Sequence, residues 1–201
     1  MLDVPDTIAT ERLLLRRPAL ADAPAVFEYG SDPEVTSWMP WPTHRALDTV
    51  VEYLASCPGT WECGTEYNWI ITERPGDRAI GSISFRPRGH SADFGYVLNR
   101  GWWGRGIASE AARAVVDWLF THDDIHRVWA TCDVENARSA RVLEKAGLSR
   151  EAVLRAWAVR PNVSPEPRDV LMYARVRGGP EGRAQGPAAS GRYPTARGTR
   201  P

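Results

Sequence analysis

The sequence predicts an α/β protein in which helices cover one mixed α+β sheet. Three β-like runs, 67–72, 79–86 and 93–98, follow one another with short, turn-rich connections, and this pattern predicts an antiparallel meander. A full-length amphipathic helix then separates the third run from another β-like run at 127–133. A strand, helix, strand order of this kind predicts a right-handed parallel crossover. The sheet is therefore expected to combine antiparallel pairs with one parallel pair.

The other elements follow from periodicity and from turn residues. A first strand is expected at 12–17, where it ends at a proline, and Asp22 can cap a short helix after it. A second helix carries an apolar stripe over 47–54. Further along, a helix at 135–147 and two terminal strands complete the pattern, the strands at 152–159 and 169–176 on either side of a proline-rich loop.

Composition limits the classes of protein that this chain can be. Its 201 residues allow one domain, expected at 8–177, and the Gly, Pro and Arg-rich segment 178–201 is predicted to be a disordered tail. The 25 basic residues balance the 25 acidic ones, so neither nucleic acid nor a membrane surface is expected as a partner. No apolar run is long enough to span a membrane, and the N-terminus lacks signal-peptide character. A cytoplasmic protein is expected, either a monomer or a homodimer.

Cysteines and histidines show no spacing typical of a metal site. The three cysteines are odd in number and are most simply reduced thiols, and the four histidines form no paired-ligand motif. No metal is therefore expected.

In the central stretch of the chain, the spacing of apolar residues changes from that of a strand to that of a helix across a glycine-rich turn. Gly101, Gly104 and Gly106 lie between a β-like run and an amphipathic helix. A helix start with free N–H groups and the positive end of the helix dipole can bind phosphate, and glycine permits close approach to the backbone. A plain strand-to-helix connection would also need glycine, so the spacing alone leaves both interpretations open.

Two common phosphate loops do not match, because GxxxxGK[ST] and GxGxxG are both absent. The segment Trp103-Gly-Arg-Gly-Ile-Ala108 instead resembles the acetyl-CoA loop of the GNAT N-acetyltransferases, and WGRGIASEA is similar to the version found in the RimJ/RimL-like branch. Trp103 departs from the Gln or Arg of the family pattern. Asn136, Ser139 and the sequence LEKAG after them resemble a second signature of the same branch.

The resemblance implies a GNAT fold, with six to seven strands in the central mixed sheet and about four flanking helices. It implies that acetyl-CoA binds with its pyrophosphate on the loop and its pantetheine arm along the strand at 94–98, which requires the parallel neighbour at 127–133 to splay away. The cofactor-binding residues implied in this way are Tyr96, Val97, Leu98, Trp103, Gly104, Arg105, Gly106, Ile107, Ala108, Asn136 and Ser139.

Two residues are candidates for proton transfer. The resemblance places Ser139 beside the cofactor sulfur, where its hydroxyl could protonate the leaving thiolate, although a helix-start hydroxyl can equally bond the backbone. Asp93 provides the only carboxylate in the central strand and is the candidate base for the acceptor amine. A solvated residue at a strand end is the alternative for Asp93.

A loop rich in proline and aromatic residues is the candidate acceptor site. Trp38, Trp41 and His44 lie in it between prolines, and large amphipathic rings beside turns often line ligand pockets. Asp93 would join them in contacting the acceptor. The alternative is that the tryptophans fill the core.

These observations predict an N-acetyltransferase that transfers acetyl from acetyl-CoA to a primary amine by direct attack. A small-molecule acceptor, for example an aminoglycoside-like antibiotic and hence a role in antibiotic resistance, would need a closed aromatic and acidic pocket. A protein N-terminal acetyltransferase of the ribosomal-protein type would need an open groove. A non-catalytic acyl-CoA sensor is the alternative from another class, and it would bind the cofactor without releasing thiol.

Overall fold

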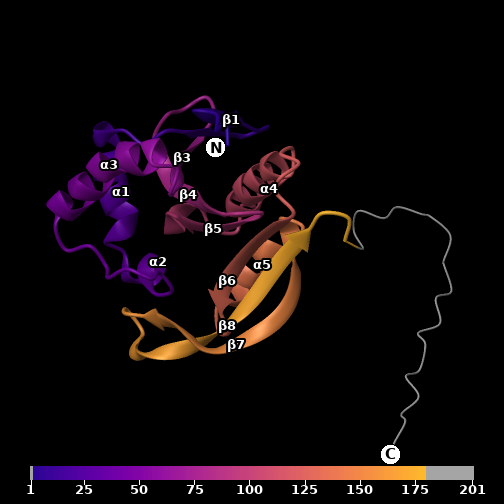
Figure 1. The fold of residues 1–201 in the computed structure, drawn as a ribbon. Coiled ribbons are helices and arrows are strands. Elements are labelled where there is room, and N and C mark those ends of the chain that lie inside the picture. The colour runs from indigo at the N-terminus through magenta and orange to yellow at the C-terminus, as the bar shows by residue number, and fades with distance from the viewer. Residues whose placement is uncertain (1, 180–201) are drawn as a thin grey trace, which may run out of the picture.

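One mixed sheet of eight strands runs through the structure, a computed structural model that describes residues 2–179. The strands lie in the order β1-β2-β3-β4-β5-β6-β8-β7, and every neighbouring pair is antiparallel except β5 and β6 (Figure 1). The predicted α/β class and the parallel pair are therefore confirmed. The predicted disordered tail at 178–201 falls outside the described residues except for Gly178 and Gly179.

The elements have the following bounds. The strands are β1 (Thr7–Ala9), β2 (Leu13–Arg16), β3 (Tyr67–Glu73), β4 (Ala79–Arg88), β5 (Ser91–Leu98), β6 (Arg127–Asp133), β7 (Ser149–Arg160) and β8 (Ser164–Val176). The helices are α1 (Ala23–Gly30), α2 (Pro33–Thr36), α3 (Leu47–Glu62), α4 (Ile107–Leu119) and α5 (Ala137–Lys145), with 3₁₀ turns η1 (Leu20–Asp22) and η2 (Arg100–Trp102).

The sheet has eight strands rather than the six or seven expected. The additional strand, β1, is three residues long, which is too short for an alternating pattern to reveal it, and it is ordered by pairing with β2. Strand β8 also begins at Ser164, five residues before its expected start. Residues 164–169 pair with β7 but not with β6, so the prolines there lie in a stretch that is open on one side.

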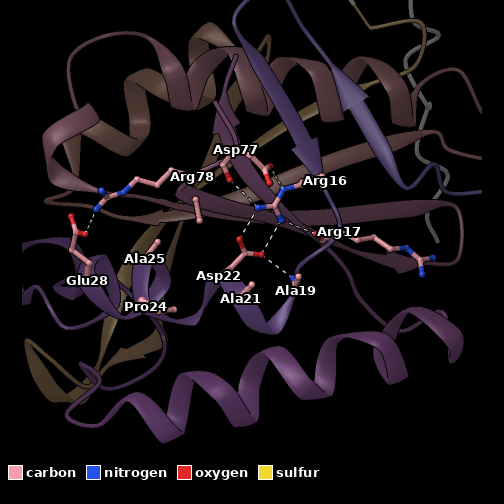
Figure 2. A pocket seen from close by; sticks show the side chains of 11 residues that line it. Arg16, Arg17, Ala19, Ala21, Asp22, Pro24, Ala25, Glu28, Asp77 and Arg78 are labelled. Carbon is pink, nitrogen blue, oxygen red and sulfur yellow. Dashed lines mark hydrogen bonds and ion pairs between the residues drawn. The ribbon is translucent and has the colours of Figure 1, made fainter. Parts of the chain in front are cut away.

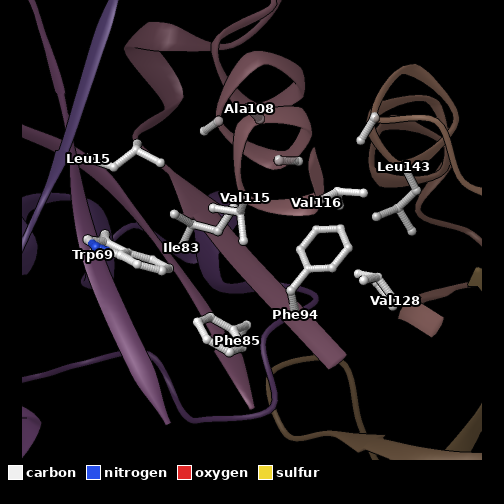
Figure 3. Packing of buried hydrophobic residues seen from close by; sticks show 14 of the residues in the cluster. Leu15, Trp69, Ile83, Phe85, Phe94, Ala108, Val115, Val116, Val128 and Leu143 are labelled. Carbon is white, nitrogen blue, oxygen red and sulfur yellow. The ribbon is translucent and has the colours of Figure 1, made fainter. Parts of the chain in front are cut away.

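Helices cover both faces of the sheet, and the strand alternation determines which side chain meets which layer. On β3, Trp69 and Ile71 pack into the core under α4 and α5, whereas Ile70 packs on the opposite face against α1 and α3. Figure 3 shows the larger core, in which α4 and α5 pack against the strands. The side chains labelled there are Leu15, Trp69, Ile83, Phe85, Phe94, Ala108, Val115, Val116, Val128 and Leu143. Within the described residues, no helix combines the length and the apolar character needed to cross a membrane.

The parallel pair opens partway along its length. Strands β5 and β6 pair only at Ser91, Ala92 and Asp93, and beyond Asp93 no pairing between them continues. The expected splay is therefore confirmed. The backbone of residues 94–98 faces a gap on that side, and this gap positions the candidate site.

Candidate active site

A cavity of about 880 Å³, here called the groove, extends from the splayed end of β5 to the glycine-rich loop. Gly104 and Gly106 both adopt positive φ, at 76° and 78°, and Gly106 is the residue that precedes the first turn of α4. Non-glycine residues reach this backbone conformation only with strain. The positive φ at these two positions therefore explains why the turn needs glycine.

The loop presents unpaired donors to the groove. Within the described residues, none of the backbone amides from Gly104 to Ala108 donates to a protein acceptor. The first amide of this helix that does so is that of Glu110, which donates to the Gly106 carbonyl, so the amides before it remain free. Free amides and the positive end of the α4 dipole converge here. The arrangement suits a phosphate group.

The loop is fixed to β2 by an ion pair. The Arg12 guanidinium donates to Glu110 Oε2 at 2.7 Å and to the Arg105 carbonyl at 3.0 Å, while Thr10 Oγ1 donates to Glu110 Oε1 at 2.6 Å. Partial burial acts to raise the pKa of Glu110, but the hydrogen bonds from Thr10 and Arg12 outweigh it and lower the pKa. Glu110 therefore stays ionised and orients both the loop and the helix start.

The opposite wall of the groove is cationic. Arg138, Arg141 and Lys145 of α5 line it, and the Arg138 guanidinium lies 4.9 Å from the centre of the Trp103 ring. The Trp103 indole N–H donates to the Leu98 carbonyl at 2.8 Å, which holds this ring beside β5. These charges can pair with additional phosphate groups of a nucleotide-linked ligand.

Ten of the eleven predicted cofactor-binding residues line the groove. The exception is Arg105, whose guanidinium lies 5.0 Å from the centre of the Trp102 ring and is absent from the lining. The ten lining residues are Tyr96, Val97, Leu98, Trp103, Gly104, Gly106, Ile107, Ala108, Asn136 and Ser139. Their roles in binding stay predictions.

A pair of hydroxyl groups lies at the inner end of the groove. Tyr96 Oη is 2.9 Å from Ser139 Oγ, and either group can be the donor. Asn136, the residue before α5, accepts a hydrogen bond from the Ser139 amide at 3.1 Å and so fixes the first turn of the helix. Burial raises the pKa of Tyr96, which keeps its hydroxyl protonated. The pair can donate a proton to a group that gains negative charge.

A second cavity of about 510 Å³, here called the inner pocket, opens on the far side of this hydroxyl pair. It shares lining residues with the groove, including Trp38, Tyr96 and Ser139, so the two cavities meet at the hydroxyl pair. All four predicted acceptor-binding residues line it, namely Trp38, Trp41, His44 and Asp93.

The aromatic loop forms one wall of the inner pocket. The Trp41 and His44 rings stack at 4.8 Å between centres, and burial lowers the pKa of His44, which favours its neutral form. Trp38 and Trp41 belong to neither buried core cluster. The packing therefore does not support the alternative that these tryptophans fill the core.

An asparagine from the β7–β8 turn ties this loop in place. Asn162 accepts from the Thr43 amide at 2.9 Å and donates to the carbonyls of Thr36 and Trp41 at 2.8 and 2.9 Å. The hairpin formed by β7 and β8 thus reaches across to the segment after α2 (Figure 1). The contact anchors the aromatic loop, whose rings line the inner pocket.

Asp93 is buried and ion-paired. One carboxylate oxygen accepts from Arg86, directly opposite on β4, and the other accepts from Arg88 at 3.2 Å. Both carboxylate oxygens are thus engaged by guanidinium groups. Asp93 is therefore not a solvated strand-end residue, and its role as the base stays a prediction that this engagement disfavours.

A third hollow of about 670 Å³ lies near β2 and α1, away from the glycine loop. Figure 2 shows the Arg16 guanidinium between Asp22 and Asp77, with Nη2 2.6 Å from Asp22 Oδ1 and Nε 2.5 Å from Asp77 Oδ1. Asp22 also accepts from the Ala19 amide and makes no capping bond to α1, so the expected cap is wrong. The charges in this hollow satisfy one another and leave little for a ligand.

Several site residues were missed by the sequence interpretation. Tyr96 was expected only to contact cofactor, and no tyrosine hydroxyl was expected near Ser139. Arg160 and Asn162 lie in a segment interpreted only as a connection, yet Arg160 lines the inner pocket. The cationic wall of the groove was not predicted either, although the basic residues at helical spacing in α5 were a signal that could have indicated it.

The splayed parallel pair and the free amides of the glycine loop suit a class of enzyme, a transferase that uses a phosphate-bearing donor. Residues 12–149 match the family model of the acetyltransferase (GNAT) domain. The chain is 33% identical to the uncharacterized N-acetyltransferase YnaD of Bacillus subtilis over 157 aligned residues. The alignment covers 77% of this chain and 89% of YnaD. A solved GNAT-family acetyltransferase from Bacillus anthracis is 30% identical, with a TM-score of 0.75, over 86% of this chain and 99% of that one.

The chain belongs to the GNAT family of acetyltransferases. It is an N-acetyltransferase, and its acetyl donor is acetyl-CoA. The solved structure of RimL, a ribosomal L7/L12 alpha-N-protein acetyltransferase in complex with coenzyme A, shares the fold at 21% identity and a TM-score of 0.74, over 85% of this chain and 97% of RimL. The expected likeness to RimJ/RimL-type enzymes is confirmed at the level of the fold.

Proposed function

We propose that this enzyme acetylates the primary amine of a small molecule that binds in the inner pocket. The observation that carries the proposal is the junction of two cavities at one hydroxyl pair, Tyr96 and Ser139. The groove suits a phosphate-bearing donor, and the inner pocket is lined by aromatic and charged side chains. A donor along β5 and an acceptor in the inner pocket would meet at this pair.

The chain's own residues fit acetyl-CoA in three respects. The free amides of residues 104–108 can receive the pyrophosphate, and Arg138, Arg141 and Lys145 can pair with further phosphate charge. The unpaired edge of β5 at residues 94–98 can hydrogen-bond an extended amide-containing arm as an added strand would. The thioester end would then lie near Ser139.

The reaction needs one bond to form and one to break. The amine nitrogen attacks the thioester carbonyl, a carbon–nitrogen bond forms, and the carbon–sulfur bond breaks to release the thiolate. Ser139, supported by Tyr96, donates a proton to that thiolate, and the amine loses a proton to solvent or to a base. Holding both substrates in one closed site contributes much of the rate, so the proposal does not require Asp93 as the base.

The size of the inner pocket and its anchored wall favour a small acceptor over an extended polypeptide N-terminus. The cavity measures about 510 Å³, and Asn162 holds the aromatic loop at its wall by bonding the backbone at Thr36, Trp41 and Thr43. One relative acts on small acceptors by its name: the L-amino acid N-acetyltransferase AaaT of Escherichia coli is 27% identical over 173 residues, covering 82% of this chain and 98% of AaaT. Ribosomal-protein N-terminal acetylation is the alternative.

A thiol-release assay with acetyl-CoA and a panel of amines tests the proposal. The panel contains amino acids, polyamines, aminoglycosides and short peptides with free N-termini. We expect turnover with at least one small amine at micromolar to millimolar KM, the ordinary range for enzymes. Turnover confined to peptides whose length and N-terminal sequence matter would support the ribosomal-type alternative instead.

A further inference from the structure

One arginine in the inner pocket has no counter-ion. Arg160, at the end of β7, is 7% exposed and lines the cavity. Its Nε is fully buried without a hydrogen-bond acceptor, and the described residues form no salt bridge with its guanidinium. A buried cation in this state is unusual, because transferring a charge out of water is costly unless the charge is paired.

The other charged side chains of the inner pocket are already paired. Arg86 pairs with Glu66 and with Asp93. Asp133, the carboxylate whose charge acts most directly on Arg160, bonds Arg168 through both oxygens, at 2.7 and 3.1 Å, and also accepts from the Glu135 amide. The requirements of Asp133 are therefore met without Arg160. The positive charge of Arg160 is left for a group that enters the pocket.

Arg160 also lies close to the reacting end of the site. Its charge acts on the Cys132 thiol of β6, which in turn neighbours Ser139. Burial raises the pKa of Cys132 to about 11, so this thiol stays neutral and does not serve as the counter-ion. Arg160 and the hydroxyl pair thus bracket a space within a single cavity of about 510 Å³.

We infer that Arg160 binds the carboxylate of the acceptor, and that the acceptors are small amines that carry a carboxylate, with α-amino acids as the simplest members. The planar guanidinium matches a carboxylate in a two-pronged hydrogen-bonded pair, and pairing removes the cost of the isolated charge. The inference rests on the proposed function and narrows its acceptor. A polycationic aminoglycoside would bring like charge to Arg160 and is disfavoured.

The first experiment compares each amino acid with its own carboxamide. Thiol release is measured with the twenty L-amino acids, and the best acceptors are then assayed beside their amides. We expect kcat/KM to be about tenfold to 10²-fold higher for the acid, the value of one or two charge-assisted hydrogen bonds. Amidation makes the amine less basic and so supplies more free amine at neutral pH, which biases the comparison against this expectation.

Variants assign the preference to Arg160. In Arg160→Met, the ratio of kcat/KM between acid and amide should fall toward one, and Arg160→Lys should retain part of it. Arg168→Met is a second test, because it releases Asp133 to pair with Arg160 and should therefore lower the ratio as well. We expect Arg160→Met to keep or raise the melting temperature, because it removes an uncompensated charge, and Arg168→Met to lower it. A lowered melting temperature for Arg160→Met with an unchanged ratio would overturn the inference.

Calorimetry on the wild-type protein saturated with CoA separates this inference from the proposed function. Acids and amides are titrated as ligands, so no turnover is required. Equal binding of both, or binding of neither, overturns the role of Arg160. Carboxylate-dependent binding without any thiol release would sustain the inference and overturn the proposed acetylation of these amines.

Discussion

Tyr96 Oη lies 2.9 Å from Ser139 Oγ, and this contact joins β5 to the first turn of α5 where the groove and the inner pocket meet. The two residues are 43 positions apart in the chain. Their hydroxyl groups come together because β5 and β6 separate beyond Asp93 and the chain after β6 returns as α5 beside the gap. A proton donor is thereby held at a place that both substrates can reach in the proposed arrangement.

The first prediction concerns this hydroxyl pair. Ser139→Ala and Tyr96→Phe should each lower kcat, by about 10²-fold to 10⁴-fold if the affected hydroxyl is the donor to the thiolate. The double variant should lose much less than the product of the two losses, because both changes interrupt one proton path. Thiol-release kinetics measure kcat, and calorimetry should find acetyl-CoA affinity nearly unchanged. Losses that multiply would show that the residues act independently.

The second prediction concerns the glycine loop. Gly106→Ala places a Cβ at a φ of 78° beside the free amides, so we expect acetyl-CoA to bind roughly tenfold to 10²-fold more weakly. The control is Gly89→Ala, which imposes comparable strain at a φ of 63° in the β4–β5 turn, where a Cβ meets open space, whereas at Gly106 it makes an ordinary contact with the Arg12 side chain at 3.5 Å. Both variants should lose similar stability in urea. If Gly89→Ala weakens acetyl-CoA binding equally, the loop has no special role.

The third prediction is a pH dependence set by Glu110. Its pKa is lowered in the folded protein, so its contribution to the free energy of unfolding is present above the ordinary glutamate pKa of about 4.3 and is lost as the pH falls through the folded pKa. Glu110→Gln should cost about 1–2 kcal/mol near neutral pH and progressively less in acid. Urea unfolding at several pH values measures this. A cost that stays constant down to about pH 3 would contradict the assigned ionisation.

The fourth prediction concerns the anchoring of the aromatic loop by Asn162. Asn162→Ala removes bonds to Thr36, Trp41 and Thr43, and the aromatic loop should become less ordered. We expect KM for the amine to rise about tenfold while KM for acetyl-CoA changes little. Trp41→Ala should act in the same direction. Equal increases for both substrates, or a large fall in melting temperature, would indicate that the contact only supports the fold.

The fifth prediction concerns Asp93. If it were the base, Asp93→Asn would lower turnover by about 10²-fold to 10⁴-fold at neutral pH and recover as the pH rises and free amine accumulates. Both of its oxygens are engaged by Arg86 and Arg88, so we expect a smaller loss without recovery at high pH, caused by the two arginines that lose this partner. A pH–rate series on both proteins distinguishes the outcomes. Recovery at high pH would establish Asp93 as the base.

The amino-acid sequence by itself determined the class of fold and indicated the glycine loop and helix start that form the candidate donor site, because both rest on local properties. The positive φ at Gly104 and Gly106, the amphipathic α4 and the Asn136 cap depend on a few consecutive residues, and such patterns can be interpreted without knowing the partners of the segment. The short strand β1 escaped this interpretation, because three residues carry no period.

Tertiary structure alone decided what the acceptor side contains. The contact between Tyr96 and Ser139, the ion pairs of Asp93, the anchoring of the aromatic loop by Asn162 and the isolation of Arg160 all join segments that are distant in the chain or depend on strand register. No periodicity indicates which buried arginine will lack a partner, since that depends on Asp133 already being bonded by Arg168. Charge pairing is settled only when the strands are in register, and here it leaves one cation for the ligand.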